Sequence, residues 1–258
     1  NNDFSNLTPI CKKNKIPIKY VKDINSKKNI EWIKSLAPDI IFCFGWSSLI
    51  KQELLNLPPM GVVGYHPAKL PQNRGRHPLI WTLVLGLKKS ASSFFFMDQR
   101  ADGGDILSQK NFDILATDNA RKLYDKVIRI ALKQIEEFIP KLQDKSYNRI
   151  KQNSEESNFW RKRNLNDGMI DFRMNSKTIF NLVRALSNPY VGAQIKYKNR
   201  NIVVWNVKII KKSKYQSNIE PGKVLSVTKN AIIIKTYDGV IEILKHEFKK
   251  LPKIGEYL

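Results

Sequence analysis

The chain has only two cysteines, Cys11 and Cys43, among its 258 residues. Neither has a second cysteine or a histidine at ligand spacing, so we expect no disulfide framework and no metal site. Cys43 lies in the apolar segment DIIFCFGW, where a small core side chain is expected rather than a nucleophile. Apolar runs of the roughly 18 residues that span a membrane are missing, as is a basic-then-apolar leader. We therefore expect a cytoplasmic protein with no membrane partner.

Acidic residues are also scarce, because 23 Asp and Glu stand against 45 Lys and Arg, for a net charge of +22. This excess favours a polyanionic partner: a nucleotide, a tRNA or an anionic membrane surface. An AT-rich genome would give the same excess through its Lys and Asn codons, so the charge supports an anionic ligand without choosing one. The apolar fraction of 42% is ordinary for a globular protein.

The first 144 residues alternate between strand and helix patterns. Strands are predicted at 16–21, 38–45, 60–66, 91–98 and 105–114, and helices at 27–36, 49–57, 78–86 and 118–143. The runs 38–45 and 60–66 are continuously apolar, as in strands buried on both faces. Asp118 is the expected cap of the last helix. This alternation predicts an α/β domain with a mostly parallel sheet covered by helices.

The second half has a different pattern. Residues 145–168 are polar and without periodicity, which predicts a linker. An amphipathic helix is expected at 176–187, followed by short alternating segments separated by turn residues. These segments predict a small β-barrel or partly open sheet. The expected organisation is a domain at 1–144, a linker at 145–168 and a β-rich domain at 169–258.

Two strand ends carry side chains suited to acid–base chemistry. The strand 60–66 ends at His66, and the loop after 91–98 contains Asp98, Asp102 and Asp105. Ligands of open α/β sheets bind at such ends, and a histidine beside a carboxylate makes an acid–base pair. A histidine before proline, or an aspartate beside Gly-Gly, is as often a hydrogen-bonded turn residue. From the residues alone both interpretations stay open.

Three segments together resemble the N10-formyltetrahydrofolate-dependent formyltransferases: HPAKLPQNRGRHP, MDQRADGGDILSQ and RNLNDGMIDFRMNSKTIFNLVRALSNPYVGA. The resemblance covers most of 38–245 in order. It implies a Rossmann-like formyltransferase domain followed by a β-rich, OB-like C-terminal domain, with N10-formyltetrahydrofolate as co-substrate and no metal. The family begins with a further strand, helix and strand that are not found here. Because the chain also opens NNDF without Met, we expect its N-terminal part to be missing.

The resemblance places the family's catalytic histidine on His66 and its catalytic aspartate on Asp102. The family's asparagine, two residues before the histidine, falls on Gly64. Losing one donor to the oxyanion typically costs ~2.7–4 kcal/mol. A main-chain N–H, a water, Asn73 or His77 would have to replace it; otherwise the protein is a slow or non-catalytic relative.

The acceptor is also inferred from the resemblance. RGRHPLIW and QRADGG are similar to the enzymes that formylate nucleotide-linked amino sugars in lipopolysaccharide or O-antigen biosynthesis. This implies substrate binding by Arg76, Asn73 and His77. Methionyl-tRNA is the alternative acceptor; otherwise no nucleic-acid partner is expected, and a homodimer is a further hypothesis. The residues expected to bind the folate are Phe44, Gly45, Trp46, Gly64, Leu70 and Gly103, although the aromatic ones would suit a plain core equally well.

Overall fold

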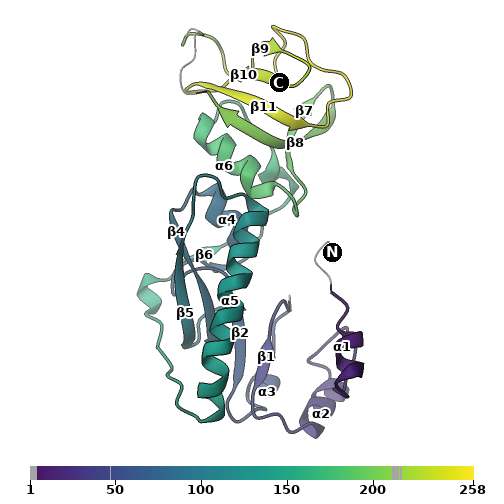
Figure 1. Cartoon of the computed structure of the whole chain (residues 1–258), viewed down its shortest axis with the longest axis vertical. Coiled ribbons are helices and arrows are strands. Elements are labelled where there is room, and N and C mark those ends of the chain that lie inside the picture. Colours follow the sequence, from purple (N-terminus) through teal and green to yellow (C-terminus); the bar gives the residue numbers. More distant parts are fainter. Residues whose placement is uncertain (1–4, 47, 211–214, 216) are drawn as a thin grey trace.

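The computed structural model describes residues 5–46, 48–210, 215 and 217–258. Two lobes stand end to end, and the long helix α5 runs the length of the first (Figure 1). The helices are α1 (Thr8–Lys13), α2 (Lys27–Ser35), α3 (Gln52–Leu55), α4 (Pro78–Val84), α5 (Ala120–Gln143) and α6 (Ser176–Leu186), with short 3₁₀ helices at Ser154–Glu156 and Leu165–Gly168. The strands of the first lobe are β1 (Ile41–Cys43), β2 (Val62–His66), β3 (Arg74–Gly75), β4 (Lys89–Phe96), β5 (Ile106–Asp113) and β6 (Phe159–Trp160).

The main sheet of the first lobe has the order β1-β2-β4-β5. The pair β1–β2 is parallel, whereas β2–β4 and β4–β5 are antiparallel. The sheet is therefore mixed rather than mostly parallel, because β4 runs opposite to both of its neighbours, β2 and β5. The predicted strand at 16–21 does not form; Ile16, Ile18 and Tyr20 are exposed and pair with no strand.

The strand β1 is shorter and more exposed than its apolar sequence predicts. It lies at the edge of the sheet, where Phe42 keeps 37% of its surface exposed. By contrast β2 lies between two strands, and Val62 and Val63 are fully buried. Position in the sheet, rather than the apolar run itself, decides which of the two strands is buried on both faces.

Helix α5 covers one face of this sheet, where Phe138 packs against Phe94. Its cap is Asn119, whose side chain accepts from the Lys122 amide at 3.0 Å, and not Asp118 as the sequence predicts. The Asp118 carboxylate instead accepts from the Lys126 ammonium at 2.6 Å. Since Asn119 has the extended backbone of an N-cap, Asp118 is left one residue outside the helix.

The second lobe is a five-stranded antiparallel sheet against α6, which confirms the predicted β-rich domain. Its strands are β7 (Ala193–Tyr197), β8 (Arg200–Ile209), β9 (Val224–Val227), β10 (Ile232–Lys235) and β11 (Val240–His246), in the order β7-β8-β11-β10-β9. Within the described strands β7 and β9 do not pair, so the sheet is open. Strand β7 has no counterpart among the predicted elements.

The two lobes share one hydrophobic core. Leu83 of α4 and Leu123 of α5 belong to the same buried cluster as Ile179 of α6 and Ile241 of β11. Helices α4 and α6 pack directly against each other at the junction of the lobes (Figure 1). This continuous apolar packing fixes the second lobe on the first.

Residues 145–168, expected to be a linker, instead lie against the first lobe. Ile150 bridges Ile106 of β5, and β6 pairs in parallel with β3. The segment is polar because one side of it faces solvent. Its other side pairs with strands of the first lobe, so it is part of that domain and not a separate linker.

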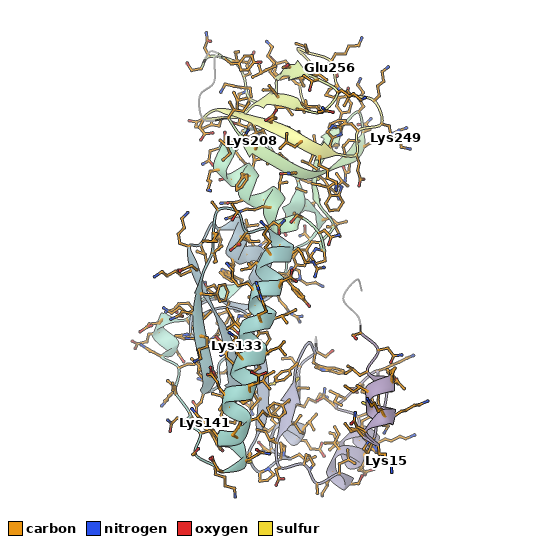
Figure 2. The ribbon with its side chains drawn as sticks, in the orientation of Figure 1. Lys15, Lys133, Lys141, Lys208, Lys249 and Glu256 are labelled. Atoms are coloured by element: carbon orange, nitrogen blue, oxygen red, sulfur yellow. The ribbon has the colours of Figure 1, made fainter. Side chains whose placement is uncertain are left out.

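Positive charge is distributed over the whole molecule. Figure 2 shows Lys15, Lys133 and Lys141 along the first lobe and Lys208 and Lys249 on the second, all of them exposed. Among the described residues no helix is long and apolar enough to cross a membrane.

Candidate active site

The first candidate group, His66, ends strand β2. Side chains alternate along a strand, so Gly64 and His66 share one face of the sheet while Tyr65 points to the α5 face. The His66 ring is almost fully buried, at 4% exposure, and its Nε2 lies 2.6 Å from the carbonyl oxygen of Asn73. A carbonyl only accepts hydrogen bonds, so this nitrogen carries a proton and the ring orientation is fixed.

The second candidate group, Asp102, lies in the loop between β4 and β5. Its backbone is left-handed, with φ of 52°. Gly104 makes this tight loop possible, because a Cβ there would lie 1.8 Å from the Phe96 carbonyl oxygen. One carboxylate oxygen, Oδ2, accepts from the Gly75 amide at 2.8 Å and lies 3.6 Å from Nδ1 of His66. The two groups predicted to pair are thus at ion-pair distance.

The surroundings of Gly64 explain why that position holds a glycine. Its φ is not in the left-handed region, so its backbone would accept a side chain. A Cβ would nevertheless meet Met97 Cγ at 2.9 Å and Phe95 Cζ at 3.0 Å. The space where an asparagine amide would project is filled by Met97, and Gly64 supplies no side-chain donor beside His66.

A cavity of about 390 Å³ opens on the other side of Met97. It lies between α3 and the start of the Asp102 loop, and its lining residues are Gln52, Leu55, Asn56, Met97, Asp98, Gln99 and Arg100. Gln99 donates to Gln52 at 2.7 Å and ties the two walls together. The α3 residues were not among the predicted site residues, because a single helical turn has no pattern that distinguishes a cavity wall.

The residues predicted to bind the folate do not all face this cavity. Phe44, one residue past the end of β1, packs against Phe94 and Tyr65 on the α5 face, with centroid distances of 5.4 and 6.4 Å, and so lies on the other face of the sheet from His66. Leu70 is 1% exposed in a cluster with Phe95, so it forms core and has no free surface for a ligand.

Three other members of that set occupy different positions. Gly45 has a φ of 67° and open space where a Cβ would project, and Trp46 is 38% exposed beside it. Gly103 is buried under Arg100, whose Cβ would lie 2.7 Å from a Cβ at this position. Gly103 therefore serves the fold of the Asp102 loop.

The predicted substrate-binding residues flank β3, with Asn73 before it and Arg76 and His77 after it. Asn73 contributes main-chain groups: its carbonyl contacts His66, and its amide donates to Asn158 at 2.8 Å. The Arg76 side chain is exposed, and its amide donates to the Trp160 carbonyl at 2.9 Å. Arg76 therefore combines a fixed backbone with a solvent-exposed cation.

His77 lies at the junction of the lobes. It contributes to a mainly apolar cavity of about 310 Å³, whose wall also includes Ile80 and Tyr190. Burial lowers the pKa of the His77 imidazole, and the nearby cations Arg163, Arg76 and Lys162 lower it further. Its Nδ1 accepts from the Arg163 amide at 3.3 Å, so the proton of the neutral ring is on Nε2.

The geometry suits proton transfer without a metal ligand set. Asp102 is the more exposed member of the pair, with 21% of its side chain accessible against 5% for His66, so a ligand entering the site meets the carboxylate first. Within the described part of the chain there is no group of three or more His, Cys, Asp or Glu that could hold a metal.

Comparison with known proteins identifies the class. The family model of the formyl transferase matches residues 4–138, and the model of the formyl transferase C-terminal domain matches residues 163–258. This protein belongs to the formyl transferase family.

Particular relatives give more detail. The bifunctional polymyxin resistance protein ArnA of Wigglesworthia glossinidia brevipalpis is 32% identical over 95% of this chain, which spans 36% of ArnA. The methionyl-tRNA formyltransferase of Clostridioides difficile (strain 630) is 29% identical over 99% of this chain and 82% of that enzyme. The crystal structure of WlaRD, a sugar 3N-formyl transferase in the presence of dTDP and 5-N-formyl-THF, has a TM-score of 0.71 at 21% identity, over 95% of this chain and 82% of WlaRD.

Proposed function

We propose that the protein transfers a formyl group from N10-formyltetrahydrofolate to the amino group of a nucleotide-linked amino sugar. The observation that carries this proposal is the 3.6 Å approach of Asp102 Oδ2 to His66 Nδ1 at the end of β2. The amine attacks the formyl carbon, and its proton passes to the Asp102–His66 pair. Once Nδ1 of His66 has taken this proton it donates a hydrogen bond to the tetrahedral oxygen, while Nε2 stays on the Asn73 carbonyl. The same proton then passes to N10 of the folate as the bond from N10 to the formyl carbon breaks.

The folate belongs, in this proposal, in the 390 Å³ cavity beside Met97. This cavity shares a wall with the Asp102 loop, so a formyl group at its inner end comes close to the catalytic pair. The amide of Asn56, just after α3, accepts from Gln52 through its oxygen and offers its NH₂ group to a polar heterocycle, and Leu55 offers an apolar surface. WlaRD, with its formyl-THF ligand, supports a folate in a fold of this kind.

The acceptor phosphates belong beside Arg76 and His77. Arg76 and Lys162, both exposed, lie near His77 and make a cationic edge between the catalytic pair and the cavity at the lobe junction, where the neutral His77 ring offers its Nε2–H as a further donor. Arginine suits phosphate recognition because its planar guanidinium donates two parallel hydrogen bonds. The dTDP present in the WlaRD structure supports a nucleoside diphosphate as the group that these cations bind.

Methionyl-tRNA remains the second candidate, because the Clostridioides difficile enzyme is similar over nearly the whole chain. The lysines labelled in Figure 2 lie on both lobes rather than on one face of either, which favours the smaller ligand, since tRNA recognition gains most from a concentrated basic surface.

The test is direct. The protein is incubated with formyltetrahydrofolate and either a panel of nucleotide-linked amino sugars or methionyl-tRNA, and the products are read by mass. A formyl group gained by a sugar amine is the expected result. Formylation of the tRNA alone, with steep loss of binding as salt rises, would replace the sugar as acceptor. Formylation of neither would favour the non-catalytic alternative raised by Gly64.

A further inference from the structure

A single amide side chain from the 145–168 segment lies behind the Asp102 loop. Gln152 is 6% exposed, and its Nε2 donates to the main-chain oxygens of Asp102 at 2.9 Å and Gly104 at 2.6 Å. Its Oε1 accepts from Nη2 of Arg74 at 2.7 Å. We propose that Gln152 is a positioning residue for formyl transfer, which holds the Asp102 carboxylate at its distance from His66.

The loop needs an external support. Asp102 has a left-handed backbone, a conformation that costs free energy for residues other than glycine. Its own side chain does not stabilise the turn, because Oδ2 is directed to Gly75 and His66. Both N–H groups of the Gln152 amide are used on carbonyls of this loop, so they stabilise the backbone that presents the carboxylate.

The other end of Gln152 is anchored on β3. Arg74 is 3% exposed, and its Nε and Nη2 both donate to Oε1 of Gln152. A hydrogen bond from a charged donor is stronger than a neutral one and polarises the amide, which strengthens the two bonds on its far side.

Strand β3 connects this anchor to both catalytic groups. Asn73, just before Arg74, accepts the His66 hydrogen bond, and Gly75, just after it, donates to Asp102. Three consecutive residues thus contact the histidine, the glutamine and the aspartate. Gln152 is the residue of this group that hydrogen-bonds the main chain of the Asp102 loop. Among the described contacts, no other side chain of the 145–168 segment does so, and replacing Gln152 therefore removes this support.

The chain offers a matched control in Gln134 of α5. Gln134 is also buried, and its Nε2 likewise donates twice, to the Ser92 carbonyl at 3.1 Å and the Ser108 hydroxyl at 2.9 Å. It lies on the α5 face of the sheet, opposite His66. Replacing either glutamine by methionine keeps the length of the side chain and removes two donated hydrogen bonds. In Gln152→Met it also removes the acceptor of Arg74, and Gln152→Glu keeps that acceptor.

The first measurement needs no substrate. Hydrogen exchange of the Gly75 amide reports whether Asp102 still accepts its hydrogen bond. In Gln152→Met we expect this amide to exchange at least about tenfold faster, since opening is then less costly, and in Gln134→Met at the original rate. Gln152→Glu, which keeps the acceptor for Arg74 but turns an oxygen toward two carbonyls, should show the same acceleration if the methionine variant folds poorly. Unchanged Gly75 exchange in the folded Gln152 variants would overturn the proposal.

The second measurement is turnover, and only this one rests on the proposed function. Gln152→Met should lower kcat roughly 10- to 100-fold, as displacement of a catalytic group does, with little change in KM for the folate. In a protein that already carries Asp102→Asn, the same change should lower kcat less than about twofold. A residue that acts through Asp102 has little left to affect once the carboxylate is gone, so the two losses are not additive. If Gln152→Met lowered kcat by the same factor with and without Asp102→Asn, Gln152 would not act by positioning Asp102. If no acceptor is formylated by the unmodified protein, the proposed function fails while Gly75 exchange still decides the role of Gln152.

Discussion

A Cβ atom on Gly64 would lie 2.9 Å from Cγ of Met97, although the backbone of Gly64 is free of any left-handed strain. Met97 occupies the space that an asparagine side chain at position 64 would need, so the glycine at 64 and the position of Met97 depend on each other. The backbone of β2 would tolerate Asn, but the side chains of Met97 and Phe95 would have to move to admit it.

The substitution Gly64→Asn should therefore destabilise the protein without accelerating transfer. Overpacking a filled space costs about 1–3 kcal/mol, with the flexibility of methionine keeping the cost toward the lower end. Chemical denaturation measures this loss of unfolding free energy. Adding Met97→Ala should restore part of the stability and allow the amide to reach the oxyanion. Turnover of the double variant should then exceed that of Met97→Ala alone, approaching the roughly hundredfold value of one donor. No gain over Met97→Ala would mean that another group already stabilises the oxyanion.

The substitution Asp102→Asn should lower formyl transfer by about 10²- to 10⁴-fold, the usual contribution of a general acid–base group. The amide oxygen still accepts from Gly75, so the loop and the melting temperature should change little. Single-turnover kinetics by mass would measure the loss. Asp125→Asn, at an exposed aspartate on α5, provides the control and should leave the rate unaffected. If Asp102→Asn transferred the formyl group as fast as the unmodified protein, the Asp102 carboxylate would have no part in the mechanism.

The substitution Arg76→Ala should raise KM for the acceptor by at least about tenfold, because a hydrogen bond to a charged group contributes roughly 1.5–3 kcal/mol. Folding stability should stay within about 0.5 kcal/mol, since the side chain is exposed and the amide keeps its bond to Trp160. Steady-state kinetics and thermal melts separate the two effects. Lys69→Ala, also exposed on this loop, is the control. A large drop in melting temperature with unchanged KM would make Arg76 structural.

Acid should weaken the start of α5. Burial alone would raise the pKa of the Asp118 carboxyl, but hydrogen bonds from Lys126 and the Leu115 amide hold it below its ordinary value of about 4. The unfolded chain then binds the proton more readily, so this stabilisation is present above about pH 4 and is lost as pH falls below it. Denaturation curves from pH 6 to 3 should show Asp118→Asn approaching the stability of the unmodified protein. A difference that stays constant over this range would exclude the ion pair as its source.

Part of the fold could be predicted because local signals and tertiary packing agree there. Pro78 and Gly86 bracket α4, and the apolar stripe of α5 predicts its length. The predicted cap of α5 was wrong by one residue. Asp118 and Asn119 are both residues that favour an N-cap, and only the tertiary structure shows that Asp118 binds Lys126 while Asn119 caps the helix.

By itself the sequence determined an α/β lobe and a β-rich lobe, because strand, helix and turn signals are local residue patterns. It also predicted His66 and the three aspartates of the following loop as candidates, and the family resemblance singled out Asp102 among them. Only the tertiary structure decided that Phe44 lies on the α5 face, that Met97 fills the space beside Gly64, and that Gln152 reaches the Asp102 loop. Those contacts join residues about 30 to 50 positions apart. No local pattern encodes them, since the direction of a side chain in space depends on how strands and loops distant in the sequence pack together.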